Sequence, residues 1–145
     1  MNDLLNPAQR VSLQVSLRLF EQSLRHAESV LNNPLEVNGI LFRQRFAISE
    51  AKRTLISTKI SAALDQIRVM RELFALDAEE ENLARQVASE LSVSWENLMD
   101  VRAKKLRGYG KIHPELPTVL DPRIKSLSAI ALELAALFGE DEAES

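Results

Sequence analysis

One uninterrupted stretch, residues 40–76, constrains the fold of this chain more than any other feature, because it contains neither glycine nor proline. Within it, apolar side chains recur at alternating spacings of four and three residues: Ile56, Ile60, Ala63, Ile67, Met70 and Phe74. This alternation puts them on one face of an α-helix, where they form a stripe that a partner can bury. The stretch predicts one long helix, bent near residues 54–58, where helix formers are scarce.

The length of this helix suggests that the chain does not fold alone. A straight helix of roughly 35 residues extends about 50 Å, whereas a compact domain of this size has a radius of gyration of about 15 Å. We therefore expect the long helix to be covered by a second copy of the chain. The six stripe residues are the predicted self-association site, and a two-fold homodimer is the simplest way to close it.

A first helix is predicted before this run. Asn6, Pro7 and Gln9 form the pattern of a helix start, with a capping side chain followed by proline at the first helical position. Apolar residues again follow the four-three alternation: Leu13, Leu17, Phe20, Leu24, Ala27 and Leu31. Pro34 ends this helix, and the Asn38-Gly39 step predicts a turn in the connection that follows.

Three further helices are expected, over residues 78–91, 95–107 and 122–139. A capping residue precedes each of them: Asp77, paired with Glu80, then Ser94 and Asp121. Residues 108–121 carry two prolines and no helical period, which predicts a surface loop. The sequence therefore predicts an all-α bundle of about five helices, a single domain over residues 1–139 followed by a disordered acidic tail over residues 140–145.

Composition narrows the classes of function. The 145 residues carry a net charge of −3, without the overall basic field that is typical of nucleic-acid binders. The absence of cysteine excludes thiolate zinc sites, iron–sulfur clusters and a thiol nucleophile. No export signal and no membrane-spanning run is evident, so we expect a cytoplasmic protein without a membrane partner.

Candidate catalytic groups are isolated along the chain. Neither His26 nor His113 has a carboxylate at the spacing that metal-binding helices use. Two acidic pairs are better explained without a metal: Asp77/Glu80 by helix capping and Glu96/Asp100 by solvation. No phosphate-binding loop and no nucleophile motif is present. We therefore expect no enzymatic activity, no cofactor and no metal.

Residues 81–107 resemble a helix-turn-helix. Small or apolar side chains occupy the inward positions of that motif: Val87, Ala88, Leu91, Val93, Leu98 and Val101. A basic cluster follows, and it would supply contacts to nucleic acid: Arg102, Lys104, Lys105 and Arg107. Ser92 replaces the usual glycine of the turn, and Glu96 and Asp100 lie on the face that would approach DNA. Simple packing of two helices is favoured over DNA recognition.

The loop expected after this segment gathers several polar side chains. Tyr109, Lys111 and His113 lie among prolines that stiffen the backbone, so the loop is a candidate partner contact. The sequence as a whole favours a non-catalytic protein that acts through protein–protein interaction and self-association. The alternative is a DNA-binding regulator that uses residues 81–107.

Overall fold

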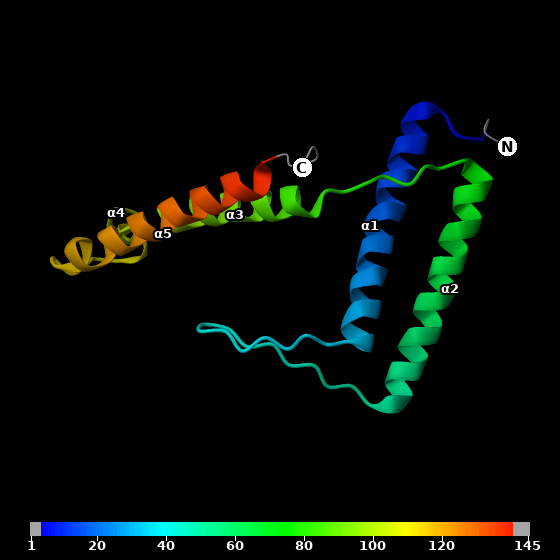
Figure 1. Cartoon of the computed structure of the whole chain (residues 1–145), viewed down its shortest axis with the longest axis horizontal. Helices are drawn as coiled ribbons and strands as arrows, with labels where there is room; N and C mark the ends of the chain where they lie inside the picture. Colours follow the sequence, from blue (N-terminus) through cyan, green and yellow to red (C-terminus); the bar gives the residue numbers. More distant parts are fainter. Residues whose placement is uncertain (1–3, 141–145) are drawn as a thin grey trace. The chain divides into compact units, whose positions relative to one another are not determined.

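The computed structural model describes residues 4–140, and helices are their only extended regular elements (Figure 1). These elements are α1 (Pro7–Asn32), α2 (Glu50–Phe74), α3 (Leu83–Met99), α4 (Ala103–Leu106), the 3-10 helix η2 (Arg107–Tyr109) and α5 (Leu116–Gly139). The predicted all-α architecture of about five helices is confirmed. Contacts divide the chain into two compact units, Met1–Glu79 and Glu80–Ser145. The single-domain organisation stays a prediction, and the tail beyond Glu140 lies outside the described residues.

The start of α1 follows the local sequence. The Asn6 side chain accepts the backbone N–H of Gln9 at 2.8 Å, and the Gln9 side chain accepts the backbone N–H of Asn6 at 2.9 Å. With Pro7 at the first helical position, this reciprocal cap leaves few unsatisfied donors in the first turn. The predicted start of the helix is confirmed, as is its end before Pro34.

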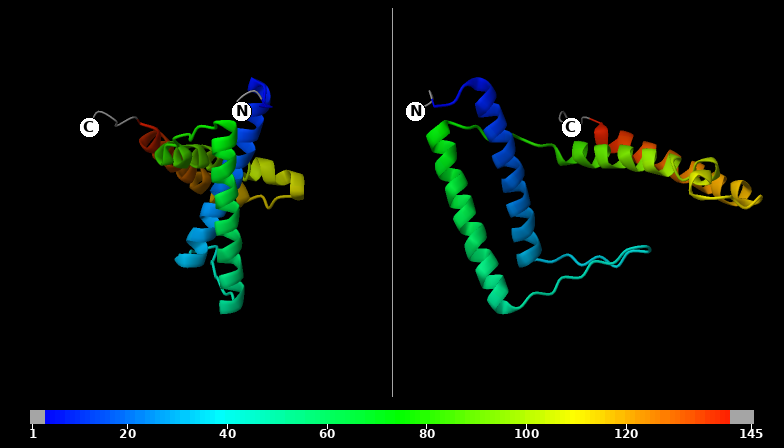
Figure 2. Two further views of the ribbon diagram at one scale, coloured as in Figure 1. Left: turned by 90° about the vertical axis from the view of Figure 1, so that its right-hand side faces the viewer. Right: turned by 180° about the vertical axis from the view of Figure 1, so that it is seen from behind.

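Two arginines connect α1 to α2, which lie side by side and antiparallel (Figure 2). Arg10, in the first turns of α1, donates from Nη1 to the carbonyl oxygen of Phe74 at the end of α2. Arg53, in the first turn of α2, donates from Nη1 to the carbonyl oxygen of Leu31 at the end of α1. The last carbonyls of a helix have no partner within it and carry partial negative charge. A guanidinium therefore stabilises each end of the pair.

The segment after α2 returns along α1. Leu76 is buried, and the side chain of Gln14 accepts the backbone N–H of Asp77 at 3.3 Å. One turn further along α1, Arg18 Nε lies 3.0 Å from a carboxylate oxygen of Glu79. These contacts fix residues 76–79 against the first helix and complete the amino-terminal unit.

The expectation of one helix over residues 40–76 is wrong in its first part, because α2 begins only at Glu50. Ser49 caps it, and its side chain accepts the backbone N–H of Lys52 at 3.2 Å. Before that cap the apolar residues Phe42, Phe46 and Ile48 are separated by even numbers of positions, the spacing of an extended strand. The lack of glycine and proline permitted a helix there without specifying one.

In the carboxy-terminal unit, α3 and α5 lie side by side in antiparallel directions (Figure 2). The buried row of α5 consists mainly of small side chains: Ile124, Ser128, Ala131 and Ala135. At the end of α5, a Cβ added at Gly139 would lie 3.8 Å from the Cβ of Ala88 on α3. Small residues on both helices allow the two backbones to approach closely along their length.

The break predicted at Ser92–Ser94 is wrong, because α3 continues through it from Leu83 to Met99. The hydroxyls of Ser92 and Ser94 donate to the carbonyl oxygens of Ala88 and Glu90, each at 3.0 Å. Serine side chains satisfied in this way are compatible with a helix interior. The predicted start near residue 78 is also wrong. Asn82 is the cap, and its side chain accepts the backbone N–H of Arg85 at 3.3 Å.

The role predicted for Asp121 is wrong as well. Helix α5 begins at Leu116, so Asp121 and Pro122 lie inside it. The Asp121 carboxylate instead accepts the backbone N–H of Ala103 at 2.9 Å, at the start of α4. The residue that flanks α4, Arg102, makes no capping hydrogen bond with its side chain. A residue distant in sequence therefore supplies the cap that α4 lacks locally.

Replacing Asp121 with alanine is expected to lower the free energy of unfolding by about 1–2 kcal/mol, because the partly buried N–H of Ala103 loses its acceptor. Urea denaturation of the full chain measures this change. Glu115→Ala is the matched control, because Glu115 flanks α5 without a capping hydrogen bond. Equal stability of the two variants would show that the Asp121 cap does not stabilise α4.

The carboxyl end of α2 stores a small strain. Ala75 adopts the left-handed conformation, with φ 50° and ψ 52°, which disfavours any residue with a Cβ atom. Ala75→Gly is therefore expected to raise the free energy of unfolding by about 0.5–1 kcal/mol. Thermal unfolding checks this against Ala62→Gly, an exposed position inside α2 where glycine should cost about 1 kcal/mol. Destabilisation by both changes would contradict the account of this cap.

Candidate interaction surfaces

Residues 34–48 form an arm that extends away from the ends of α1 and α2 (Figure 1). Two extended segments pair in it: the N–H of Gly39 donates to the carbonyl of Phe42, and the N–H of Gln44 to that of Val37, each at 2.8 Å. An antiparallel bridge joins Asn38 and Arg43. The turn expected at the Asn38-Gly39 step lies slightly further along the chain, because Asn38 belongs to the bridge and the chain reverses at Ile40 and Leu41, at the tip of the arm.

The arm has one polar and one apolar face, because side chains alternate along paired strands. On the polar face, the guanidinium of Arg45 donates to the side chain of Asn38 at 2.8 Å. On the other face, a Cβ added at Gly39 would lie 2.8 Å from the ring of Phe42, so only glycine leaves room for this ring. The register places four apolar residues on that face: Leu35, Val37, Phe42 and Phe46.

Apolar side chains at the tip of the arm are almost completely exposed. Ile40 is 100% exposed and Leu41 is 96% exposed, and Leu35 and Phe42 are also exposed. An isolated two-stranded hairpin is marginally stable in water. The arm is therefore a candidate contact surface, which the sequence analysis missed. The signal was the period-two spacing of its apolar residues.

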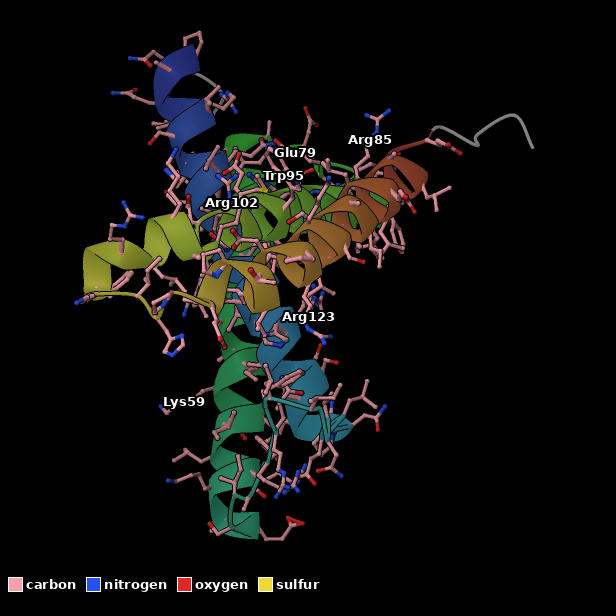
Figure 3. The ribbon with its side chains drawn as sticks, turned by 90° about the vertical axis from the view of Figure 1, so that its left-hand side faces the viewer. Lys59, Glu79, Arg85, Trp95, Arg102 and Arg123 are labelled. Atoms are coloured by element: carbon pink, nitrogen blue, oxygen red, sulfur yellow. The ribbon has the colours of Figure 1, made fainter. Side chains whose placement is uncertain are left out.

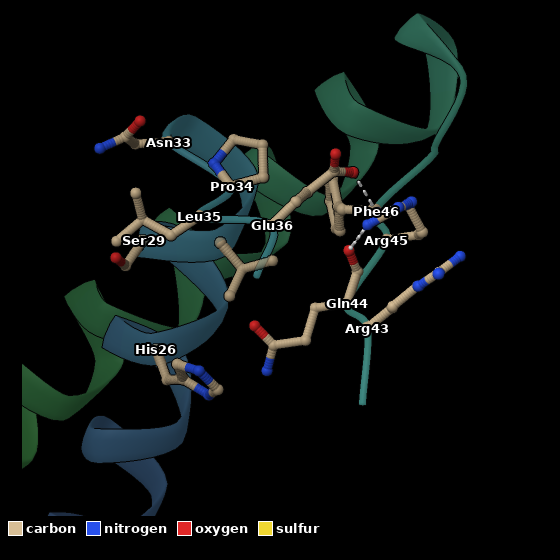
Figure 4. A pocket seen from close by; sticks show the side chains of 11 residues that line it. His26, Ser29, Asn33, Pro34, Leu35, Glu36, Arg43, Gln44, Arg45 and Phe46 are labelled. Carbon is tan, nitrogen blue, oxygen red and sulfur yellow. Dashed lines mark hydrogen bonds between the residues drawn. The ribbon is translucent and has the colours of Figure 1, made fainter. Parts of the chain in front are cut away.

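A pocket of about 570 Å³ lies between the last turns of α1 and the base of the arm (Figure 4). His26 and Ser29 line it from α1, and Glu36 lines it from the arm. The Glu36 carboxylate accepts the backbone N–H of Phe46 at 2.7 Å, so it supports the hairpin. Within residues 4–140 no hydrogen bond joins His26 to either of these groups, and no cluster of three metal-ligating side chains is present. The pocket thus lacks an assembled acid–base or nucleophilic pair.

Most of the predicted self-association stripe is turned toward α1. Ile60 is buried at 6% exposure, and the other members are half-buried: Ile56, Ala63, Ile67, Met70 and Phe74. In the described part of the chain, α1 is the helix that contacts α2, so these residues form the seam of the helix pair. Their role in binding a second copy stays a prediction.

Other large apolar side chains of the same helices remain exposed, by 37–63%: Val11, Val15, Leu19, Phe20, Leu55, Val69 and Leu73. The first-helix stripe expected from the sequence is therefore divided. Leu31 is buried, whereas Phe20 is half exposed to solvent. Apolar spacing predicted the period of these helices correctly without showing which side the partner helix would occupy.

The basic cluster proposed for nucleic acid lies at the end of α3 and beyond it. Arg102 donates from Nε to the carbonyl oxygen of Met99 at 2.9 Å, which satisfies the last turn of α3 (Figure 3). The other three residues, Lys104, Lys105 and Arg107, are exposed on α4 and η2. Because α3 is continuous, these residues do not follow a recognition helix. Binding of DNA by this cluster stays a prediction.

The predicted partner loop is shorter than expected. Tyr109 belongs to η2 and is 92% exposed, and Lys111 and His113 are exposed in the segment before α5. Nδ1 of His113 accepts the backbone N–H of Glu115 at 3.1 Å, which stabilises the turn into α5. The histidine therefore has a structural partner, and its contact with another protein stays a prediction.

No protein-family model, curated protein or solved structure matches this chain. Over residues 4–140, none of the helices combines the length and the apolar character needed to cross a lipid bilayer.

Proposed function

We propose that this protein is non-catalytic and acts through protein–protein interaction, including association with a second copy of itself. One observation in the amino-terminal unit carries the proposal: more of its large apolar side chains are exposed than are buried. Across both helices and the segment after α2, four large apolar side chains are buried: Leu31, Ile60, Leu64 and Leu76. The seven exposed ones on α1 and α2 outnumber them.

A layer of two helices has two sides, and pairing within the chain can cover only the side where the helices meet. Complete burial of a large aliphatic side chain stabilises a protein by about 1.5–3 kcal/mol relative to exposure. Covering exposed residues such as Val11, Phe20 and Val69 by another layer would therefore favour assembly. A second copy brings a complementary two-helix layer, and two-fold symmetry closes the assembly without leaving an open end.

The arrangement of polar groups supports the non-catalytic part of the proposal. Within residues 4–140, neither histidine makes a hydrogen bond to a nucleophile or to a second acid: the His113 side chain bonds to the backbone at the start of α5, and His26 lines a pocket whose carboxylate supports the arm. General acid–base or nucleophilic catalysis requires two or three groups held within hydrogen-bond reach of one another. Interaction through apolar faces has no such requirement.

The mass of the protein in solution tests self-association. Light scattering on the full chain at micromolar concentration is expected to give at least twice the chain mass of 16.3 kDa. Val69→Glu should lower the measured mass, because it places a charge on an exposed apolar face of α2. Ser61→Glu, at an exposed polar position about 80° around the same helix from Val69, is the matched control and should leave the mass unchanged. A wild-type mass of 16.3 kDa throughout the concentration range would contradict the proposal.

A further inference from the structure

Helix α5 carries a second apolar row besides the small residues that face α3. These residues recur at spacings of three, four and three, and we call them the outer seam: Leu127, Ile130, Leu134 and Leu137. Their exposed fractions are 51%, 48%, 39% and 62%. At 100° per residue, the outer seam is centred about 110° around the helix from the row that packs on α3. Contact with α3 therefore leaves the outer seam open.

The spacing of the outer seam is that of core positions in a coiled coil, where each large side chain fits between side chains of a facing helix. Its members are larger than those of the α3-facing row, in which Ser128, Ala131 and Ala135 allow close backbone contact. The two rows thus differ in the partner that they fit. The small row fits a closely packed helix of the same unit, and the outer seam fits a helix at coiled-coil distance.

We propose that the outer seam binds the outer seam of a second copy, with the two α5 helices antiparallel about a two-fold axis. This inference rests on the self-association proposed above and assigns one site to it. A spacing of three, four and three is the same from either end, so the antiparallel arrangement aligns every member. Leu127 of one copy then lies opposite Leu137 of the other, and Ile130 lies opposite Leu134.

Charge selects the antiparallel direction over the parallel one. Arg123 lies four residues before Leu127 on the face of the outer seam, and Glu140 follows the carboxy-terminal end of the seam (Arg123 is labelled in Figure 3). In an antiparallel pair the basic end of each α5 meets the acidic end of the other, whereas a parallel pair brings like charges together. The distribution of charge thus matches a second copy of this chain.

A pair of adjacent substitutions tests the site. Ile130→Glu places a carboxylate in the middle of the outer seam, and Ala129→Glu places the same charge one residue away, at an exposed position outside the seam. Sedimentation velocity of the full chain should show an association constant lowered about tenfold or more by Ile130→Glu and unchanged by Ala129→Glu. Circular dichroism should show that both variants keep their helical content.

The outcomes separate the two proposals. If wild type associates and Ile130→Glu associates equally well, the outer seam is not the interface, and self-association through another surface stands. If wild type is monomeric, both proposals fail. A loss of association in both variants would overturn the assignment to the seam, because the charge itself would then be the cause.

Disulfide cross-linking tests the direction of pairing without adding a charge to the outer seam. The chain contains no cysteine, so Leu127→Cys and Leu137→Cys each introduce a single thiol. The two variants are mixed, left to exchange under reducing conditions and then oxidised. The antiparallel arrangement predicts a disulfide between the two different variants. Identical positions would lie about 15 Å apart, beyond the Cα separation of about 4.4–6.8 Å that a disulfide spans. Cross-links between identical variants, or none at all, would overturn the proposal.

Discussion

The amino-terminal unit depends on an exchange of arginines between two antiparallel helices. Arg10 and Arg53 each lie near the start of one helix and donate to the last carbonyl groups of the other. The exchange is possible only when the helices run in opposite directions with their ends aligned, so it selects both direction and register. Because Arg53 holds the start of α2 beside the end of α1, the segment that joins the two helices begins and ends at neighbouring points. That closure favours the paired hairpin of the arm over a continuation of either helix.

Sequence alone predicted the parts of the fold that depend on neighbouring residues. The start of α1 is an example, because Asn6 and Gln9 satisfy each other across three positions. Where the structure differs from the sequence prediction, the cause is a contact that the spacing of residues along the chain does not reveal. Asp121 caps a helix that begins eighteen positions before it. Ser92 and Ser94, which suit a turn as well as a helix, bond within α3.

Apolar periodicity likewise predicted the helices better than it predicted their contacts. Ile124, Leu127, Ala131, Leu134 and Phe138 follow the same four-three alternation along the last helix, which predicts one shared face, but the structure divides them. Ile124 and Ala131 are buried against α3, whereas Leu127, Leu134 and Phe138 are exposed. A helix rich in apolar residues has several rows that fit a heptad pattern, and only the neighbouring helix decides which row is buried. The exposure of the arm tip has a similar cause, because no element of the described chain covers residues 40–42.

The central claim of this account is that one chain leaves apolar faces open and that association with a second copy covers them. Such association stabilises the folded state by mass action, so stability must then depend on protein concentration. The most direct measurement is the midpoint of thermal unfolding of the full chain, followed by circular dichroism over a hundredfold range of concentration around the micromolar level. The account predicts a midpoint that rises steadily with concentration. A midpoint that stays constant over this range would contradict it.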